Sequence, residues 1–176
     1  MATTLVLTAI GVDRTGLVAA LSQTVADHGG NWLKSRVSCL ANRFAGILLI
    51  SVPEPNAAAL KTALQALGSA NLQIAVDESA PEATAVAYRT VKLELMGQDR
   101  AGIIHEISEA LSKHRVSIDE LVTEVQSASW SGETHFHVNA ELRVPRDVST
   151  ALLRDVLEDI ANEFMVDITL DDVPTS

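Results

Sequence analysis

The sequence predicts an α+β protein made of two tandem copies of one small βαββαβ unit. Three observations support this class: one loop motif occurs twice, an alternating apolar segment precedes each occurrence, and apolar residues at helical spacing follow. The chain of 176 residues is 47% hydrophobic, so it has enough apolar side chains for two small cores. Disorder is therefore not expected as its main state.

The repeated loop has the form G-x-D-R-x-G and is followed by a branched aliphatic residue. It covers residues 11–17 in the first copy and residues 97–103 in the second, an offset of 86 positions. Residues 3–10 and 90–96 alternate before it. The apolar residues after it recur every four positions, at Leu21, Val25, Ile107 and Leu111. This change from a period of 2 to a period of 3.6 predicts a strand, a turn and a helix in each copy.

The first helix is expected over residues 14–28 and is expected to end at Gly29 and Gly30, because glycine commonly ends a helix. The second copy has Arg115 and Val116 at that place. Further strands are indicated by runs of β-branched and apolar residues, at 32–40, 44–52 and 72–77 in the first copy and at 118–127, 134–144 and 164–170 in the second.

A second helix is expected to begin after Pro53 and, in the other copy, after Pro145. Its apolar face should consist of Leu60, Leu64 and Leu67 in the first copy and of Leu152, Val156 and Ile160 in the second. The order βαββαβ is the ferredoxin-like arrangement, here in tandem. We expect a first domain at residues 1–80, a linker at 81–88 and a second domain at 89–172.

In this arrangement the helices cover one face of each sheet and leave the other face open. On the first strand of each copy, the residues expected on the open face are Val6, Thr8 and Ile10 or Lys92, Glu94 and Met96. The open face of the first copy is therefore the more apolar one. It favours sheet-on-sheet packing or a homodimer formed through the first copy.

The net charge of −10 is carried by the second half, because residues 1–80 hold five basic and five acidic side chains. A neutral half joined to an acidic half is a poor ligand for nucleic acid or for an anionic membrane. The N-terminus lacks a positive leader region, and no apolar run is long enough to span a membrane, so a cytoplasmic protein is expected. The lone Cys39 cannot form an internal disulfide and is expected to be a small buried hydrophobe.

The repeated loop is also the candidate binding site. Free N–H groups at the start of a helix suit a carboxylate, and Gly16 and Gly102 let a ligand approach the backbone. The carboxylate of Asp13 or Asp99 suits an ammonium group, so one turn has complementary ends for an α-amino acid. Asn31 and Ser117 stand at the start of the next strand, and we expect them to lie near enough to complete the pocket.

Other interpretations of these residues are structural. Aspartate before a helix is a common N-cap, and glycine at a turn can serve only to pack helix against strand. His135 and His137 lie on one strand face, but two ligands are too few for a metal site. The sequence has no nucleophile, phosphate-loop or dinucleotide motif, so neither catalysis nor a cofactor is expected.

The motif D-R-x-G-[LI] between a strand and a helix of a βαββαβ unit resembles the ACT domain. A tandem pair without a catalytic domain is most similar to the glycine cleavage system transcriptional repressor family. The resemblance implies a non-enzymatic, glycine-responsive repressor that acts through a DNA-binding activator protein. It also implies ligand contacts at Asp13, Gly16, Leu17 and Asn31 in the first copy and at Asp99, Gly102, Ile103 and Ser117 in the second.

Two alternatives stay open at this stage. Similar loops precede the catalytic domains of formyltetrahydrofolate deformylases, which would make the chain a regulatory part of an enzyme. A purely structural dimerisation module with empty loops is the other alternative. For a regulator, Trp130 at the tip of the longer second hairpin is the expected partner contact, because exposed aromatic residues are enriched at binding hot spots.

Overall fold

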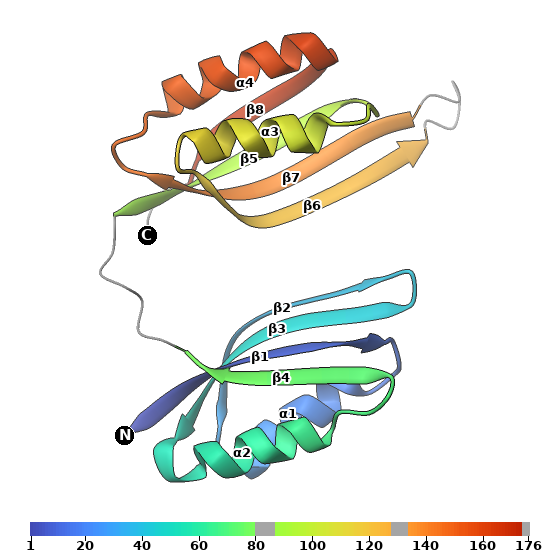
Figure 1. The fold of residues 1–176 in the computed structure, drawn as a ribbon, viewed down its shortest axis with the longest axis vertical. Coiled ribbons are helices and arrows are strands. Elements are labelled where there is room, and N and C mark those ends of the chain that lie inside the picture. The colour runs from blue at the N-terminus through green and yellow to red at the C-terminus, as the bar shows by residue number, and fades with distance from the viewer. Residues whose placement is uncertain (80–86, 128–133, 174–176) are drawn as a thin grey trace. The chain divides into compact units, whose positions relative to one another are not determined.

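A computed structural model describes residues 1–79, 87–127 and 134–173 of the chain. The chain divides into two compact units, Met1–Ala83 and Thr84–Ser176, and each is described by itself (Figure 1). Most of the expected linker, residues 81–86, lies outside the described residues.

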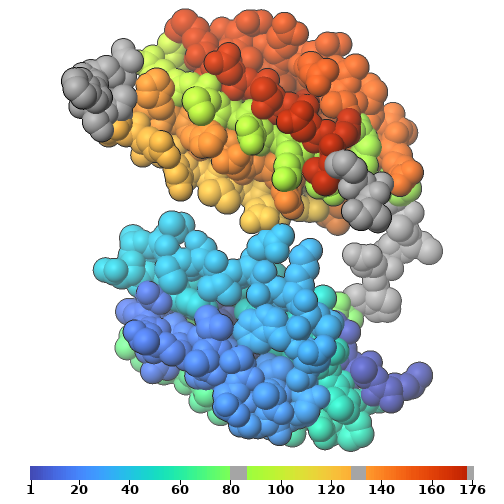
Figure 2. Space-filling model, turned by 180° about the vertical axis from the view of Figure 1, so that it is seen from behind, coloured from blue at the N-terminus to red at the C-terminus, as the bar shows by residue number. Residues whose placement is uncertain are grey.

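The first unit has the order βαββαβ that the sequence predicts. Its elements are β1 (Ala2–Val12), α1 (Leu17–Asp27), β2 (Asn31–Leu40), β3 (Arg43–Pro53), α2 (Glu54–Ala66) and β4 (Leu72–Glu78). The strands form one antiparallel sheet in the order β2-β3-β1-β4, so β2 and β4 are its edges. Figure 2 shows the blue atoms of α1 beside the light-blue atoms of β2 on the surface of this unit.

The second unit repeats this order and this sheet. Its elements are β5 (Tyr88–Gln98), α3 (Ile103–Lys113), β6 (Ser117–Ser127), β7 (Thr134–Pro145), α4 (Thr150–Phe164) and β8 (Val166–Asp172). The strand order is β6-β7-β5-β8, again antiparallel throughout. The two tandem ferredoxin-like units of the α+β class are thus confirmed.

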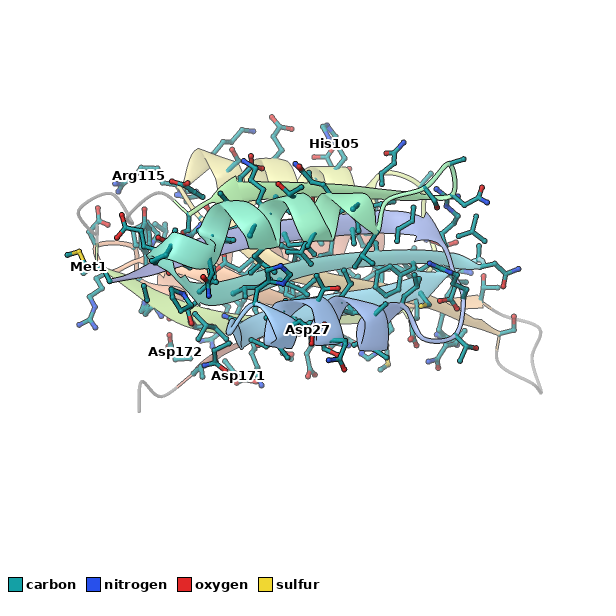
Figure 3. All side chains as sticks on the ribbon, turned by 90° about the horizontal axis from the view of Figure 1, so that it is seen from below. Met1, Asp27, His105, Arg115, Asp171 and Asp172 are labelled. Atoms are coloured by element: carbon teal, nitrogen blue, oxygen red, sulfur yellow. The ribbon has the colours of Figure 1, made fainter. Side chains whose placement is uncertain are left out.

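Each core lies between one face of a sheet and its two helices. In β1 the alternate residues Leu5, Leu7 and Ala9 are buried, while Val6 and Thr8 are only half-buried on the other face. The same alternation buries Val91, Leu93 and Leu95 in β5. Charged side chains such as Asp27, His105 and Arg115 are exposed and lie at or near the helices, outside the cores (Figure 3). The expected division into a covered and an open face is confirmed in both sheets.

Three details of the helices differ from the prediction. Helix α1 begins at Leu17 rather than at residue 14, because the left-handed backbone of Gly16 starts it there. Helix α4 begins at Thr150, after the N-cap Ser149, and its buried residues are Leu153 and Leu157. The predicted face of α4 was wrong by about one position: Leu152 is 43% exposed, while Val156 and Ile160 are only half-buried.

The closing strand of the second unit was also placed too early. Phe164 is still helical, and Met165 leaves α4 in the left-handed conformation, so β8 starts at Val166. Cys39 is exposed rather than buried, because it lies near the end of the edge strand β2. Within the described ranges, no helix is long and apolar enough to cross a membrane.

Candidate functional site

The two G-x-D-R-x-G loops have nearly the same backbone at the start of their helices. Gly16 and Gly102 are the N-caps of α1 and α3, with φ angles of 91° and 96°. In this left-handed region a side chain is disfavoured, which explains the glycine at both places. A Cβ atom at either glycine would meet no other atom within 4 Å, so the space beside each helix start is open.

Among the described residues, neither α1 nor α3 has a side-chain cap hydrogen bond at its N-cap. The capping interpretation of Asp13 and Asp99 is therefore wrong, since each lies three residues before the N-cap glycine. The first N–H groups of a helix have no partner within it, so both loops present donors and the positive end of a helix dipole to a ligand.

Backbone hydrogen bonds hold the first loop against two neighbouring turns. The Val12 N–H donates to the Asn71 carbonyl at 2.8 Å, and the Asp13 N–H donates to the Asn42 carbonyl at 2.9 Å. In the second unit the Asp99 N–H donates to the Thr134 carbonyl at the longer distance of 3.4 Å. The aspartate of the first loop is thus the more firmly positioned of the two.

The aliphatic residue after each glycine points into the protein. Leu17 is 4% exposed and Ile103 is 2% exposed, and each belongs to the hydrophobic core of its own unit. Their side chains are therefore occupied by packing. Only their backbone N–H groups, in the first turn of each helix, are placed for a ligand.

Asn31 and Ser117 do not lie beside the aspartate loops of their own units, contrary to the prediction. Asn31 pairs with Ser51 of β3, which pairs with Thr4 of β1, so Asn31 is level with a residue nine positions before Asp13. At about 3.3 Å per residue, this separation is about 30 Å. The antiparallel strands put the start of β2 and the end of β1 at opposite ends of the sheet.

Ser117 is displaced in the same way. It pairs with Arg143, which pairs with Thr90, again nine positions before the loop aspartate, Asp99. The antiparallel strands put the start of β6 and the end of β5 at opposite ends of the sheet.

A thiol that the sequence analysis did not connect with the site lies beside Asp13. Partial desolvation, together with a hydrogen bond to the Asp13 carboxylate and its negative charge, raises the pKa of Cys39. In the second unit the equivalent residue of the edge strand is Val125, opposite Phe136 as Cys39 is opposite Phe44. The strand register could have indicated this neighbour of Asp13, because a residue near the end of β2 lies level with the end of β1.

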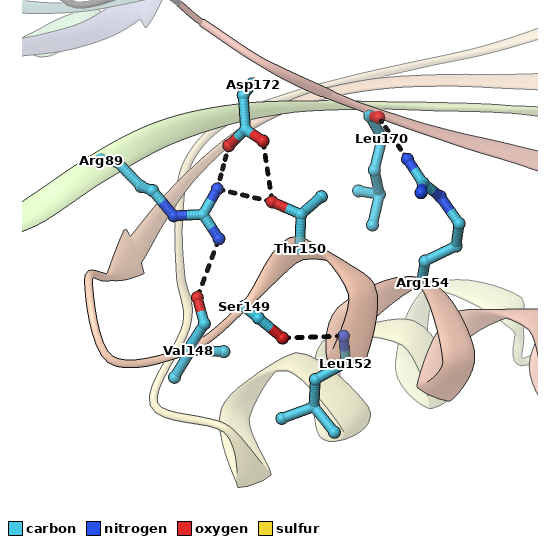
Figure 4. A network of polar contacts seen from close by, with 8 residues as sticks. All are labelled: Arg89, Val148, Ser149, Thr150, Leu152, Arg154, Leu170 and Asp172. Atoms are coloured by element: carbon cyan, nitrogen blue, oxygen red, sulfur yellow. Dashed lines mark hydrogen bonds and ion pairs between the residues drawn. The ribbon is translucent and has the colours of Figure 1, made fainter.

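The second unit also has a polar network around Arg89, at the position where the first unit has Thr3. The Arg89 guanidinium donates to the Val148 carbonyl at 2.8 Å, to the Thr150 hydroxyl at 2.7 Å and to Asp172 (Figure 4). The Thr150 hydroxyl also donates to Asp172 at 2.8 Å. Because these groups satisfy one another, the network ties β5, the start of α4 and the end of β8 together.

The described part of the chain contains no group of three or more His, Cys, Asp or Glu side chains placed to hold a metal ion. His135 and His137 lie on the open face of β7, opposite Gln98 and Met96. Trp130, the predicted partner contact, lies outside the described residues.

Comparison with known proteins finds a family for the first unit. Residues 3–77 match the family model of the ACT domain. This match spans nearly the whole first unit, and the second unit has the same element order and sheet topology. The chain is thus a tandem of two ferredoxin-like units, the first of which matches the ACT domain.

Among individual proteins, the chain resembles the glycine cleavage system transcriptional repressor of Escherichia coli (strain K12). The two are 23% identical over 160 residues, which cover 90% of this chain and 84% of the relative. A crystal structure of an unknown protein from Galdieria sulphuraria has a TM-score of 0.83 and 28% identity, with 99% of this chain and 100% of that chain covered. A crystal structure described as a putative glycine cleavage system transcriptional repressor has a TM-score of 0.70 and 21% identity, covers 99% of both chains and shares the fold.

Proposed function

We propose that this chain is a non-enzymatic, amino-acid-responsive regulator that represses glycine cleavage genes in the cytoplasm by binding a DNA-binding activator protein. The ACT domain match and the resemblance to the repressor of Escherichia coli support a regulatory role. The acidic excess of the second half supports action through a protein rather than through direct contact with DNA.

The observation that carries the proposal is the start of helix α1, directly after Gly16, which has no side-chain cap. The N–H groups of the first turn of α1 bind the carboxylate of the amino acid, and the helix dipole favours its negative charge. The Asp13 carboxylate binds the ammonium group. Because the space beside Gly16 is open, the backbone itself can contact a ligand as small as glycine.

The second loop offers the same chemistry through Asp99 and Gly102. Asn31 and Ser117 take part only where another ACT unit brings the start of its edge strand to such a loop. The resemblance to the ACT domain also implies that small amino acids bind at interfaces between ACT units, and this division agrees with it. In this proposal the loop is the primary site and the asparagine is a contribution from a neighbouring unit.

Cys39 supplies a test of the first loop without any added probe, because it is the sole cysteine of the chain and lies beside Asp13. Besides desolvation, the hydrogen bond to Asp13 and its charge raise the pKa of the thiol, and an ammonium group bound to Asp13 counteracts these two contributions. We therefore expect glycine at tens of millimolar to lower the pH midpoint of Cys39 alkylation by iodoacetamide.

The control is Asp13→Asn, in which the midpoint should already be low and should not respond to glycine. Titration calorimetry with glycine, alanine and serine on the same two proteins measures affinity and specificity directly. An alkylation profile that glycine leaves unchanged, together with no heat of binding, would contradict amino-acid sensing at this loop. A midpoint that responds equally in Asp13→Asn would contradict the role of the aspartate.

A further inference from the structure

Each unit carries a shallow hollow on the sheet face that no helix covers. In the first unit the hollow has a volume of about 190 Å³, and its floor is formed by Val6, Ile47 and Leu49. Lys34 and Arg36, on the edge strand β2, stand at its rim. An apolar floor with a cationic rim fits an acidic surface that also carries apolar side chains.

The hollow of the second unit has a volume of about 230 Å³ and is mainly acidic. Its lining includes Glu94, Glu120 and Glu141, with Lys92 beside them. Glu120 and Glu141 are direct neighbours on adjacent strands. On its other side Glu141 is directly opposite Lys92, so the row of these three side chains is acidic as a whole.

The two hollows occupy equivalent places. Across the first sheet, Lys34, Leu49 and Val6 form one row, and across the second sheet Glu120, Glu141 and Lys92 form the matching row. In both units the row follows a bulge in the edge strand, between Trp32 and Lys34 or between Ile118 and Glu120. The same position in the fold thus carries basic residues in the first unit and mainly acidic residues in the second. The charge at the rim is reversed between two equivalent surfaces.

Exposed apolar residues accompany the charges on both faces. Ile10 and Ile47 are 51% and 50% exposed on the first face, and Met96 and Val122 are 55% and 47% exposed on the second. Exposed apolar residues accompanied by charges of opposite sign are typical of a specific protein contact. The apolar area supplies affinity, and the charges supply orientation.

We propose that the open sheet face of the first unit binds the open sheet face of the second unit in another copy of this chain. Each copy supplies one face of each kind, so two identical contacts close a two-fold dimer. In sheet-on-sheet packing the faces lie about 10 Å apart, which brings Lys34 and Arg36 to the glutamates of the opposite hollow. This contact does not depend on the proposed amino-acid site.

Charge reversal tests the contact. The variants Lys34→Glu and Glu120→Lys each place like charges at both contacts of a pair, and each should weaken self-association at least about tenfold, measured by sedimentation equilibrium. A mixture of the two variants forms pairs in which both contacts again join opposite charges. The mixture should therefore associate about as tightly as the unaltered chain, although neither variant does so alone.

Lys61→Glu, which makes the same charge change on helix α2, is the control and should leave association unchanged. Thermal unfolding of Lys34→Glu and Glu120→Lys is measured alongside, so that lost association is distinguished from unfolding. A chain that stays monomeric, single variants that associate like the unaltered chain, or a mixture that fails to recover association would each overturn the proposal.

Discussion

The strand-to-helix loops of the two units share a backbone but differ in almost everything that touches it. Gly16 and Gly102 have φ angles within a few degrees of each other, and both begin a helix without a side-chain cap. Beside the first loop lie the thiol of Cys39 and a short hydrogen bond to Asn42, whereas the second has Val125 and a longer bond to Thr134. The repeat therefore retains the geometry of a binding turn in both units, while only the first retains a well-held carboxylate beside a polar neighbour.

The largest expected effect concerns the first glycine of each loop. A Cβ atom at Gly11 would lie 2.2 Å from the backbone oxygen of Asn71, whereas at Gly97 the nearest atom is a side-chain methyl of Val166 at 2.4 Å. Backbone cannot move aside as a side chain can. Gly11→Ala should therefore destabilise the first unit by about 3 kcal/mol, and Gly97→Ala should destabilise the second by about 1–2 kcal/mol.

Urea unfolding of both variants measures this difference. Adding Val166→Ala to Gly97→Ala removes the closest methyl and should recover part of the loss, beyond the sum of the two single effects. Equal losses for the two glycines, or no recovery in the double variant, would show that the loops are not held as differently as the distances indicate.

The next effect concerns ligand affinity. Asp13→Ala should weaken amino-acid binding by about 1.5–3 kcal/mol, roughly tenfold to a hundredfold, because a charged hydrogen bond is lost. Asp99→Ala should cost less, since the second aspartate is held by a longer backbone bond. Calorimetry on the two variants measures the loss of affinity in each. Equal losses would contradict the expected asymmetry between the loops.

The network around Arg89 is a difference between the units that affects stability rather than ligand binding. Arg89→Met should destabilise the second unit by about 1–2 kcal/mol, because the carbonyl of Val148 loses its guanidinium donor and the carboxylate of Asp172 keeps only the donor from Thr150. Arg154→Met removes a single long contact of 3.4 Å to the Leu170 carbonyl and should cost less. Thermal unfolding compares the two. An Arg89 variant that melts no lower than the Arg154 variant would contradict a tie between β5, α4 and β8.

The difference between the units also explains what could be predicted from the sequence. Periodicity and the repeated motif were sufficient for the element order, the two sheets and the covered faces, because burial follows alternation along a strand. The apolar face of α4 was misplaced because the helix has two neighbouring apolar rows, one with Leu152 and Val156 and one with Leu153 and Leu157, and the second row is the buried one. Periodicity along the sequence does not decide which of two such rows packs against the sheet.

The site was predicted in part for a similar reason. The loop and its glycines carry a local signal, since a left-handed turn selects glycine from the backbone alone. The partners of Asp13 depend on strand register instead. Register placed Cys39 beside it and put Asn31 at the far end of the sheet, and neither result follows from spacing along the chain.

The smallest expected effect lies at the ends of α1 and α3. Gly29 ends the first helix at a φ of 67°, and Arg115 takes the equivalent place at 60°, where a side chain is strained. Arg115→Gly should relieve about 1 kcal/mol of that strain but also removes the exposed ion pair with Asp147.

The guanidinium of Arg115 holds the pKa of Asp147 below its ordinary value of 3.8. A carboxylate whose folded pKa is lowered contributes stability above its unfolded pKa and loses it as the pH falls through the folded value. The ion pair therefore opposes the gain from Arg115→Gly at neutral pH and ceases to do so in acid. The stability gain of the variant should increase as the pH is lowered below about 3.8, as measured by urea unfolding at pH 7 and pH 3. A gain that is the same at both pH values would show that the arginine remains at this helix end for a reason other than its ion pair.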